Sequence, residues 1–261
     1  MKTLIFADVH LEVGPPGEKT LRDFTDFLRQ IDPAEFDRTI ILGDLFDFWF
    51  EYRHVIFSAY FDVLRAFADL HERGMSCHLV CGNHDFWAGR FLEQHLGFTI
   101  HRDRYVCVLG DKRVLFVHGD GTNPSDYGYR AFKYVARAPW AARLFRILHP
   151  DWAMSLAQRV SHSSRRLLSP DDPRESREVE AMRKFAKGLL ADGEADVVFC
   201  GHTHHPVEEE FPTPNGSGTY INTGDWMHHR TYLEWDEEGF HRKYYGVEER
   251  HDAAGPSENR Q

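Results

Sequence analysis

The stretch CHLVCGNHD, residues 77–85, joins a short apolar run directly to a cluster of polar side chains. Its first five residues have the length and composition of a buried strand, and Gly82-Asn83-His84-Asp85 follows them without a break. Strands of this kind are typical of α/β proteins, where functional side chains follow the carboxyl ends of buried strands. The stretch therefore predicts a strand that leads into a functional loop.

Five other apolar runs share this character, and most of them also end in a polar cluster. They are Thr3 to Ala7, Thr39 to Leu42, Val114 to Val117, Val197 to Cys200 and Thr219 to Ile221. Amphipathic helical patterns over residues 21–31 and 60–70 separate the first three strands of the chain. The order strand, helix, strand, helix, strand predicts parallel pairing in this half of the chain.

The later strands follow a different pattern. Residues 105–109 and 113–117 flank Gly110-Asp111, which predicts a hairpin, and residues 219–245 have the pattern of a meander of strands. Together with the first half, this predicts a mixed α/β architecture.

The polar clusters at the strand ends consist almost entirely of metal-ligand types. They are Asp8 and His10; Gly43 and Asp44; Asn83, His84 and Asp85; His118 and Asp120; and His202 and His204. The carboxyl ends of strands open into one crevice, so we expect these side chains to meet. Oxygen and imidazole donors suit Mn²⁺, Zn²⁺ or Fe²⁺, and the lack of cysteine among these clusters argues against a structural zinc site. Any one cluster has the composition of an ordinary turn, but the five together favour a two-metal centre for phosphoester cleavage.

The strand pattern stops between about Asp126 and Lys187, where the sequence is helix-prone with breaks at Pro139 and Pro150. Residues 129–168 hold eight Lys or Arg against one acid, Asp151. The apolar side chains of this stretch could line a groove or contact lipid, or else pack on the core as a lid with solvated charges. They are Tyr134, Trp140, Leu144, Phe145, Ile147, Leu148, Trp152 and Met154.

We therefore expect three parts: a core of residues 1–125 and 188–247, a basic helical lid of residues 126–187, and a disordered tail of residues 248–261. The formal net charge of −10 argues against general nucleic-acid binding. No apolar run approaches the ~18 residues of a membrane span, and Asp8 comes too early for a signal peptide. These features predict a cytoplasmic protein.

The ordered set of motifs from Asp8 to His204 resembles the calcineurin-like metallophosphoesterase superfamily. Further features are similar to the UDP-2,3-diacylglucosamine hydrolase family, which cleaves a nucleotide-linked lipid precursor of lipid A. They are Leu45 to Trp49, Asp126-x-x-Tyr129, the basic insertion and His205-Pro206. The resemblance implies a four-layer α-β-β-α sandwich of two mixed sheets with a helical cap above two divalent ions, most readily Mn²⁺, with Zn²⁺ or Fe²⁺ as alternatives.

The resemblance also implies a role for each motif residue. One ion would be held by Asp8, His10 and His204, the other by Asn83, His118 and His202, and Asp44 would bridge both. His84 would stabilise charge on the phosphate or protonate the leaving oxygen, with Asp85 orienting its ring; alternatively, His84 is only a partner of a ligand. Asp120 would accept a hydrogen bond from a ligand imidazole. The substrate head group would contact Asp126, Tyr129, Arg130, Ser164 and Arg165.

The best-described hydrolases of this family carry arginine where this chain has His84, although histidine is usual in the wider superfamily. Arg90 or an arginine of the lid could supply that phosphate contact. The sequence predicts hydrolysis of UDP-2,3-diacylglucosamine to UMP and the acylated sugar 1-phosphate, with the basic lid on the cytoplasmic membrane surface. The alternatives are a phosphodiesterase or phosphomonoesterase for another phosphoester, and a metal-free scaffold, against which the seven competent donors argue.

Overall fold

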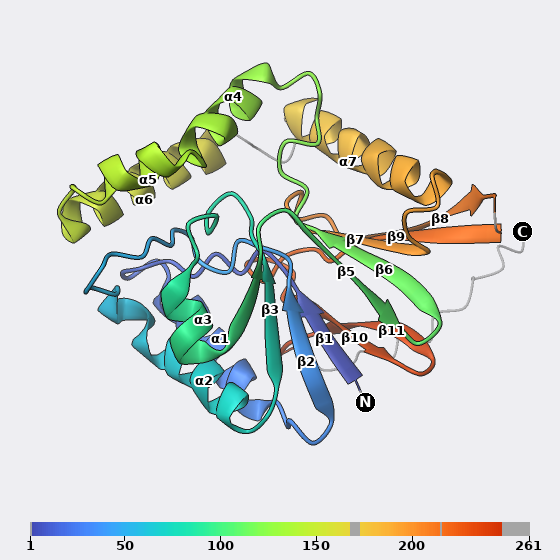
Figure 1. Cartoon of the computed structure of the whole chain (residues 1–261), viewed down its shortest axis with the longest axis horizontal. Coiled ribbons are helices and arrows are strands. Elements are labelled where there is room, and N and C mark those ends of the chain that lie inside the picture. Colours follow the sequence, from blue (N-terminus) through green and yellow to red (C-terminus); the bar gives the residue numbers. More distant parts are fainter. Residues whose placement is uncertain (1, 168–172, 215, 247–261) are drawn as a thin grey trace, which may run out of the picture.

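The computed structural model describes residues 2–167, 173–214 and 216–246, with backbone alone for 160–167 and 173–175. The predicted tail, residues 248–261, lies outside this range. The described elements form two sheets, flanked by helices, with three further helices over one edge (Figure 1).

The first sheet has six strands and mixed pairing. Its order is β11 (Gly239–Tyr244), β10 (Thr231–Asp236), β1 (Lys2–Phe6), β2 (Phe36–Ile41), β3 (Ser76–Val80) and β4 (Phe98–His101). Strands β1 to β4 run parallel to one another, as the strand and helix order predicted for the first three, and β10 pairs antiparallel with both β1 and β11. The parallel strands bring their carboxyl ends, and the loops that follow, to the same edge of the sheet.

The second sheet has five strands and is also mixed. Its order is β5 (Arg104–Leu109), β6 (Lys112–Val117), β7 (Val197–Cys200), β9 (Gly216–Asn222) and β8 (Val207–Thr213). β5 and β6 form the predicted hairpin, and β6, β7 and β9 run parallel. The loops after β6 and β7 therefore leave the same edge of this sheet.

The layers of the molecule follow from its three apolar clusters. Helices α1 (Glu18–Gln30), α2 (Phe61–Glu72) and α3 (Arg90–Leu96) pack on the outer face of the first sheet. Ile5, Phe116 and Phe199 belong to the cluster between the two sheets. Helix α7 (Pro173–Ala191) covers the outer face of the second sheet through Met182 and Leu190. The predicted four-layer α-β-β-α sandwich of two mixed sheets is confirmed.

Helices α4 (Tyr127–Ala136), α5 (Pro139–Phe145) and α6 (Pro150–Leu167), here called the cap, lie above the loops at the carboxyl ends of the strands (Figure 1). The ring of Phe145 lies 4.9 Å from that of Phe50 and 4.8 Å from that of Trp87, measured between centroids. Gln158 Nε2 donates to Val13 O at 2.7 Å. The predicted end of the lid at residue 187 falls inside α7. This helix packs on the second sheet, whereas the cap helices lie above the loops.

The sequence pattern missed several elements and misassigned one. Strands β4 and β8 and helix α3 were not predicted. The meander predicted over residues 219–245 is wrong, because β9 belongs to the second sheet whereas β10 and β11 belong to the first. The chain changes sheets between Asn222 and Thr231, and apolar periodicity does not report which sheet a strand joins. Within the described residues, no helix combines the length and apolarity that crossing a membrane requires.

Candidate metal centre

The loops that carry the predicted ligands are tied to one another by backbone hydrogen bonds. Asp8 N donates to Gly43 O at 3.2 Å and His10 N donates to Asp44 O at 2.9 Å, which joins the loops after β1 and β2. The loop after β3 is joined to the same pair, because His84 N donates to Asp44 Oδ1 at 2.9 Å. The loops thus form one framework, and the predicted convergence of these strand ends occurs.

The first group of donors comes from the loops after β1 and β7. Asp8, His10 and His204 offer ligand atoms that all lie within 4.8 Å of one another. His10 Nε2 is 3.3 Å from His204 Nε2, and Asp8 Oδ1 is 3.5 Å from His204 Nε2. This is the set that the sequence assigned to one ion.

The second group comes from the loops after β2, β3, β6 and β7. Asp44, His118 and His202 also offer atoms within 4.8 Å of one another. His118 Nε2 lies 3.3 Å from Asp44 Oδ2 and 3.1 Å from Asn83 Oδ1. Asp44 Oδ2 is also 3.8 Å from His10 Nε2, so this carboxylate lies between the two groups, where the sequence expected a bridging ligand.

The far sides of the histidine rings are held by acceptors. His118 Nδ1 lies 2.6 Å from Leu42 O, and His204 Nδ1 lies 3.1 Å from Asp225 Oδ2. A ring that donates from Nδ1 keeps its Nε2 lone pair for a ligand bond, which is the usual arrangement behind metal-bound histidine. The role of Asp225 was missed by the sequence analysis. The available signal was an aspartate three residues after the end of β9.

The backbone of the centre is strained. Six non-glycine residues of the described chain have positive φ, and five of them are predicted ligands. These five are Asp8 (51°), His10 (47°), Asp44 (52°), His202 (66°) and His204 (59°). A left-handed conformation costs an ordinary residue of order 1–3 kcal/mol and is concentrated at functional sites. The interlocked loops are what hold these side chains in place, and no sequence pattern announced this strain.

Two glycines make room for the donors. At Gly82 an added Cβ would lie 2.1 Å from Asp44 Oδ1, and at Gly43 it would lie 2.6 Å from His118 Nδ1. Gly43 also has a φ of 82°, so both space and conformation require glycine there. Gly43 thus serves a sharp turn, whereas Gly82 allows close approach of the Asp44 carboxylate.

The donors fit divalent cations on their chemistry. Asp8 is fully buried, and its Oδ1 has no hydrogen-bond partner in the described chain although it faces His204. Burial raises the pKa of Asp8 to about 6. A buried carboxylate with a free oxygen gains from a bound cation, and the surrounding imidazole and carboxylate donors suit Mn²⁺, Zn²⁺ or Fe²⁺. The clusters are therefore consistent with a dinuclear metal site.

Asp44 and His118 shift the pKa values of each other in opposite directions. Burial alone would raise the pKa of Asp44, but the charge of His118 and of His84 outweighs it and holds that pKa well below its usual range. Burial would likewise lower the pKa of His118, yet Asp44 raises it to about 10. For His202, burial and the charge of His118 outweigh the nearby carboxylates of Asp120 and Asp44 and lower the pKa to about 3. The central carboxylate is thus kept ionised by its neighbours.

His84 lies at the open side of the centre. Its Nε2 is 3.9 Å from Asp44 Oδ2, and its Nδ1 is 2.7 Å from the backbone carbonyl of Asp47. The expected orientation of this ring by Asp85 is wrong. Asp85 instead accepts from Gly82 N at 2.7 Å and from Leu45 N at 3.0 Å, so it fixes the two loops. Asp85 and His84 are neighbours in a tight turn, and their side chains point to opposite sides of it.

Asp120 also has partners other than those expected. Its Oδ2 accepts from Tyr129 OH at 2.9 Å, and it pairs with Lys133 Nζ at 2.8 Å and Arg137 Nη2 at 3.4 Å. No ligand imidazole is among the hydrogen-bond partners of Asp120 in the described chain, so that prediction is wrong. All three partners belong to α4 or its end, and Asp120 therefore anchors the cap beside His118.

The predicted substrate contacts fall into two groups. Asp126 caps α4, since its Oδ1 accepts from Tyr129 N at 2.8 Å, and Tyr129 reaches Asp120, so both side chains have structural roles. Arg130 is exposed, with Nη1 3.4 Å from Pro124 O. The side chains of Ser164 and Arg165 lie outside the described part of the chain.

Comparison with known proteins agrees with this centre. The sequence model of the calcineurin-like phosphoesterases matches residues 1–206, which include every predicted ligand. The chain belongs to the calcineurin-like phosphoesterase family. The chain is thus a metal-dependent phosphoesterase, as the sequence analysis expected, and the buried His/Asp clusters are consistent with its metal site.

Several curated relatives of this phosphoesterase carry the same name, UDP-2,3-diacylglucosamine hydrolase. The protein of Photorhabdus laumondii is 30% identical over 87% of this chain and 92% of its own length. That of Porphyromonas gingivalis is 31% identical over 75% and 78%, and that of Haemophilus influenzae is 28% identical over 89% and 94%.

Solved structures of low sequence identity also match. YfcE, a phosphoesterase from E. coli, is 17% identical with a TM-score of 0.39, covering 90% of this chain and 88% of that one. Vacuolar protein sorting 29 from Cryptosporidium parvum is 12% identical with a TM-score of 0.41, covering 89% and 83%.

Two divalent cations in this phosphoesterase would supply Lewis acidity to a phosphoryl group and lower the pKa of water. The chain's own residues then position the reaction. His84 presents Nε2 on the open side of Asp44, where it can donate to a phosphoryl or leaving-group oxygen, and the Asp47 carbonyl fixes its tautomer. The cap lies above the loops that carry these residues (Figure 1).

We expect Asp225→Asn to weaken Mn²⁺ binding by roughly 10–100-fold, the usual effect of losing a carboxylate behind a metal-bound histidine. Asparagine keeps the volume of Asp225 but loses the charge that faces His204 Nδ1. Calorimetric titration of Mn²⁺ into the metal-depleted protein measures the change, with the exposed Asp62→Asn as the matched control. Unchanged affinity in a folded Asp225→Asn protein would show that His204 needs no support from Asp225.

Proposed function

We propose that this phosphoesterase hydrolyses the diphosphate of UDP-2,3-diacylglucosamine and releases UMP and 2,3-diacylglucosamine 1-phosphate. In this proposal Asp8, His10 and His204 bind one ion, Asn83, His118 and His202 bind the other, and Asp44 binds both. The ions are Mn²⁺ in the first instance, with Zn²⁺ and Fe²⁺ as alternatives. The shared name of the relatives supports the substrate.

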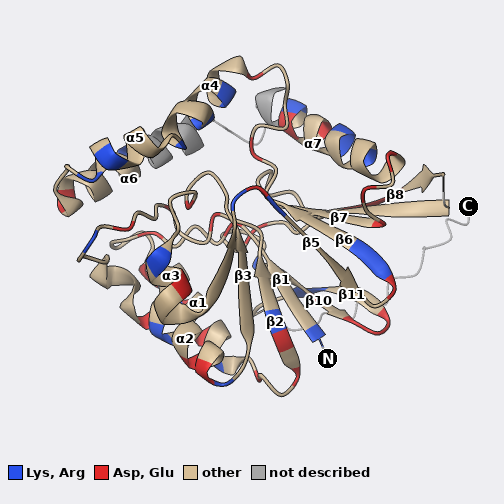
Figure 2. Ribbon diagram, in the orientation of Figure 1, with Lys and Arg blue, Asp and Glu red and all other residues tan. Residues whose placement is uncertain are grey.

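The surface of the cap is the observation that carries the proposal. Seven apolar side chains of the cap helices and the segments that join them are more than half exposed: Tyr127, Phe132, Tyr134, Trp140, Leu144, Ile147 and Trp152. Exposed arginines lie among them, including Arg143 and Arg146, and Figure 2 shows such basic positions along the cap. An exposed apolar surface of this kind marks an interaction site, and basic residues beside it favour an anionic amphiphile.

The cap is also attached to the core. Of the two alternatives for its apolar side chains, packing on the core therefore describes some of them and contact with a lipid describes the others. Phe145 packs between Phe50 and Trp87, and Met154 belongs to the core cluster. The side chains that remain exposed are therefore not needed to seat the cap. They are available to acyl chains or to a membrane surface, and we place the cap on the cytoplasmic face of the membrane.

We further propose that the substrate head group passes the start of α4, and Ser164 and Arg165 stay predicted contacts. Arg130 is exposed there and has only a long contact to Pro124 O, so its guanidinium is available for phosphate. Asp126 and Tyr129 contribute by holding α4 in position next to Asp120, whether or not they also touch the substrate.

A comparison of substrates tests the proposal. With Mn²⁺, kcat/KM for UDP-2,3-diacylglucosamine in mixed micelles should exceed that for UDP-N-acetylglucosamine by at least about 100-fold, because only the former buries acyl chains against the cap. Ile147→Glu should lower the rate on the lipid-linked substrate alone. Val108→Glu, which changes a similarly exposed residue on β5, is the matched control.

Equal turnover of both nucleotides would contradict the proposal and favour a phosphodiesterase for soluble substrates. Activity confined to a phosphomonoester would do so as well. A chain that binds no Mn²⁺ and hydrolyses none of these compounds would support the metal-free scaffold alternative.

A further inference from the structure

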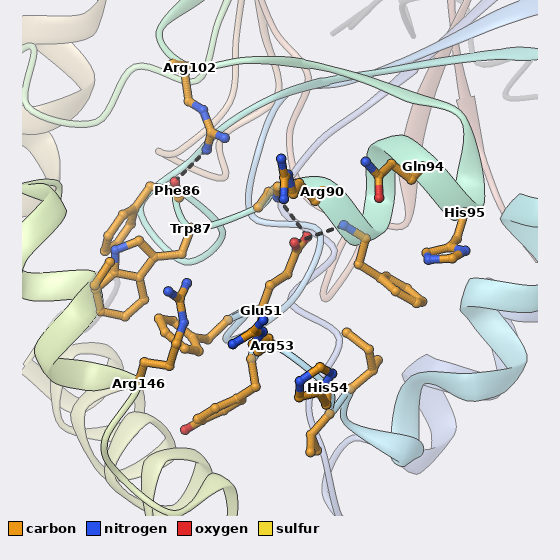
Figure 3. A pocket seen from close by; sticks show the side chains of 18 of the residues that line it. Glu51, Arg53, His54, Phe86, Trp87, Arg90, Gln94, His95, Arg102 and Arg146 are labelled. Carbon is orange, nitrogen blue, oxygen red and sulfur yellow. Dashed lines mark hydrogen bonds between the residues drawn. The ribbon is translucent and has the colours of Figure 1, made fainter.

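A large cavity lies beside the metal centre but is not part of it. It has a volume of about 1280 Å³ and is enclosed by residues 50–56, residues 86–95 and the ends of α4 and α5 (Figure 3). None of the seven predicted metal ligands lines it, and His84 does not either. The cavity therefore needs an explanation other than the reaction at the metals.

The lining of the cavity is strongly basic. Five arginines line it against two acids, Glu51 and Asp103, in a chain whose formal net charge is −10. The arginines are Arg53, Arg90, Arg102, Arg137 and Arg146. Figure 3 shows that they come from different walls: Arg53 from the loop after β2, Arg90 from α3, and Arg146 from the end of α5. Such convergence of cations in an acidic protein indicates an anionic ligand.

Both lining acids have partners: Asp103 pairs with Arg137 at 3.1 Å, and Glu51 accepts from backbone amides. Glu51 Oε1 accepts from Gly89 N at 2.7 Å, and Oε2 accepts from Phe91 N at 2.9 Å. Its carboxylate thus fixes the turn before α3. Within the described chain, Arg53 and Arg90 form no ion pair or hydrogen bond, and both side chains are exposed. Their guanidinium groups are free to bind a phosphate.

Aromatic residues supply the rest of the wall. Tyr52 and Trp87 line the cavity, and the hydroxyl of one and the indole nitrogen of the other are buried without a hydrogen-bond partner in the described chain. A buried donor without an acceptor lowers the stability of a protein, and the Tyr52 hydroxyl and the Trp87 indole nitrogen are both donors. Phe50 and Phe86 complete an apolar face.

We propose that this cavity is a second anion site, which binds a phosphate group attached to an apolar or aromatic group. The phosphate would contact Arg53 and Arg90, and the attached group would lie against Tyr52 and Trp87. A phospholipid head group and a nucleotide both have this chemistry. The site is independent of the reaction, and it does not rest on the identity of the hydrolysed substrate.

The test measures binding to the full chain loaded with Mn²⁺. Dihexanoyl phosphatidic acid, UMP and inorganic phosphate are titrated by calorimetry into the wild type, into R53Q/R90Q, and into R22Q/R113Q. The last variant removes two exposed arginines that lie outside the cavity. We expect one of the first two probes to bind at least tenfold tighter than inorganic phosphate, and R53Q/R90Q to weaken that binding at least tenfold while R22Q/R113Q does not.

Which probe binds identifies the source of the phosphate: the short-chain lipid indicates a head group and UMP indicates a nucleotide. Three results would each overturn the proposal. They are the absence of saturable binding by both probes, equal affinity for inorganic phosphate, and unchanged affinity in R53Q/R90Q. The last result would assign the observed binding to the metal centre.

Discussion

Asp44→Ala is expected to lower kcat/KM for phosphoester hydrolysis by roughly a thousandfold or more, since losing even a partner of a metal ligand costs about 10–100-fold. Asp44 Oδ2 lies 3.3 Å from His118 Nε2 and 3.8 Å from His10 Nε2, so one side chain serves both groups of donors. Its other oxygen accepts from His84 N, which ties the loop after β3 to the centre. The substitution removes all of these contacts at once.

The metal content of the variant separates loss of ligand from loss of fold. Asp44→Ala should bind fewer than two Mn²⁺ per chain after dialysis, whereas its circular dichroism should match the wild type. Asp44→Asn, which keeps a carbonyl oxygen and the side-chain volume, should retain more metal and more activity than Asp44→Ala. Full activity in Asp44→Ala would remove Asp44 from the centre altogether.

His84→Ala is expected to reduce kcat by about 10²–10⁴-fold, the range for a positioned proton donor, and to leave two Mn²⁺ per chain. The reason is geometric: His84 lies on the open side of Asp44, and its Nδ1 is already held by the Asp47 carbonyl. Metal analysis and steady-state kinetics on the same preparation measure both quantities.

Two further variants distinguish the possible roles of His84. His84→Arg restores the residue of the best-described hydrolases and should keep a phosphate contact, so its KM should stay near the wild-type value. Asp85→Asn should instead lower the melting temperature, because Asp85 binds Gly82 N and Leu45 N. If His84→Ala lost metal, the residue would be a ligand and the assigned role would be wrong.

Much of the centre could be predicted because its residues follow strands. Asp8, Asn83, His118 and His202 each come shortly after a buried apolar run, and parallel strands bring such ends to one edge. The partition of the donors into two groups came from the family resemblance. The distances in the structure bring together Asp8, His10 and His204, and Asp44, His118 and His202, but they also form a third group of His10, Asp44 and His84. Whether they bind metal stays a prediction.

The partners behind the donors were less accessible to sequence reasoning. The family resemblance assigned Asp85 to His84, and Asp120 was assigned to a ligand imidazole; both acids lie within two residues of a histidine in sequence. In the structure Asp85 binds backbone amides and Asp120 binds α4, whereas the carboxylate behind His204 is Asp225, 21 residues away. Adjacent residues in a tight turn point in different directions, so sequence proximity misleads at this level.

The fold shows the same division between local and distant information. The pattern of residues 1–80 predicted β1, β2 and β3 with α1 and α2 between them, because local periodicity decides that order. The sheet assignment of β10 was not visible, because it depends on Leu4 pairing with Glu234 across most of the chain. The strained φ angles at Asp8 and His204 likewise depend on contacts between loops.

The most direct test of the account is anomalous diffraction from a crystal of the Mn²⁺-loaded protein. We predict two peaks per chain, about 3.5–4 Å apart, the usual separation in two-metal sites. One should be bounded by Asp8, His10 and His204, the other by Asn83, His118 and His202, with Asp44 reaching both. A single peak, or peaks bounded by other residues, would contradict the account.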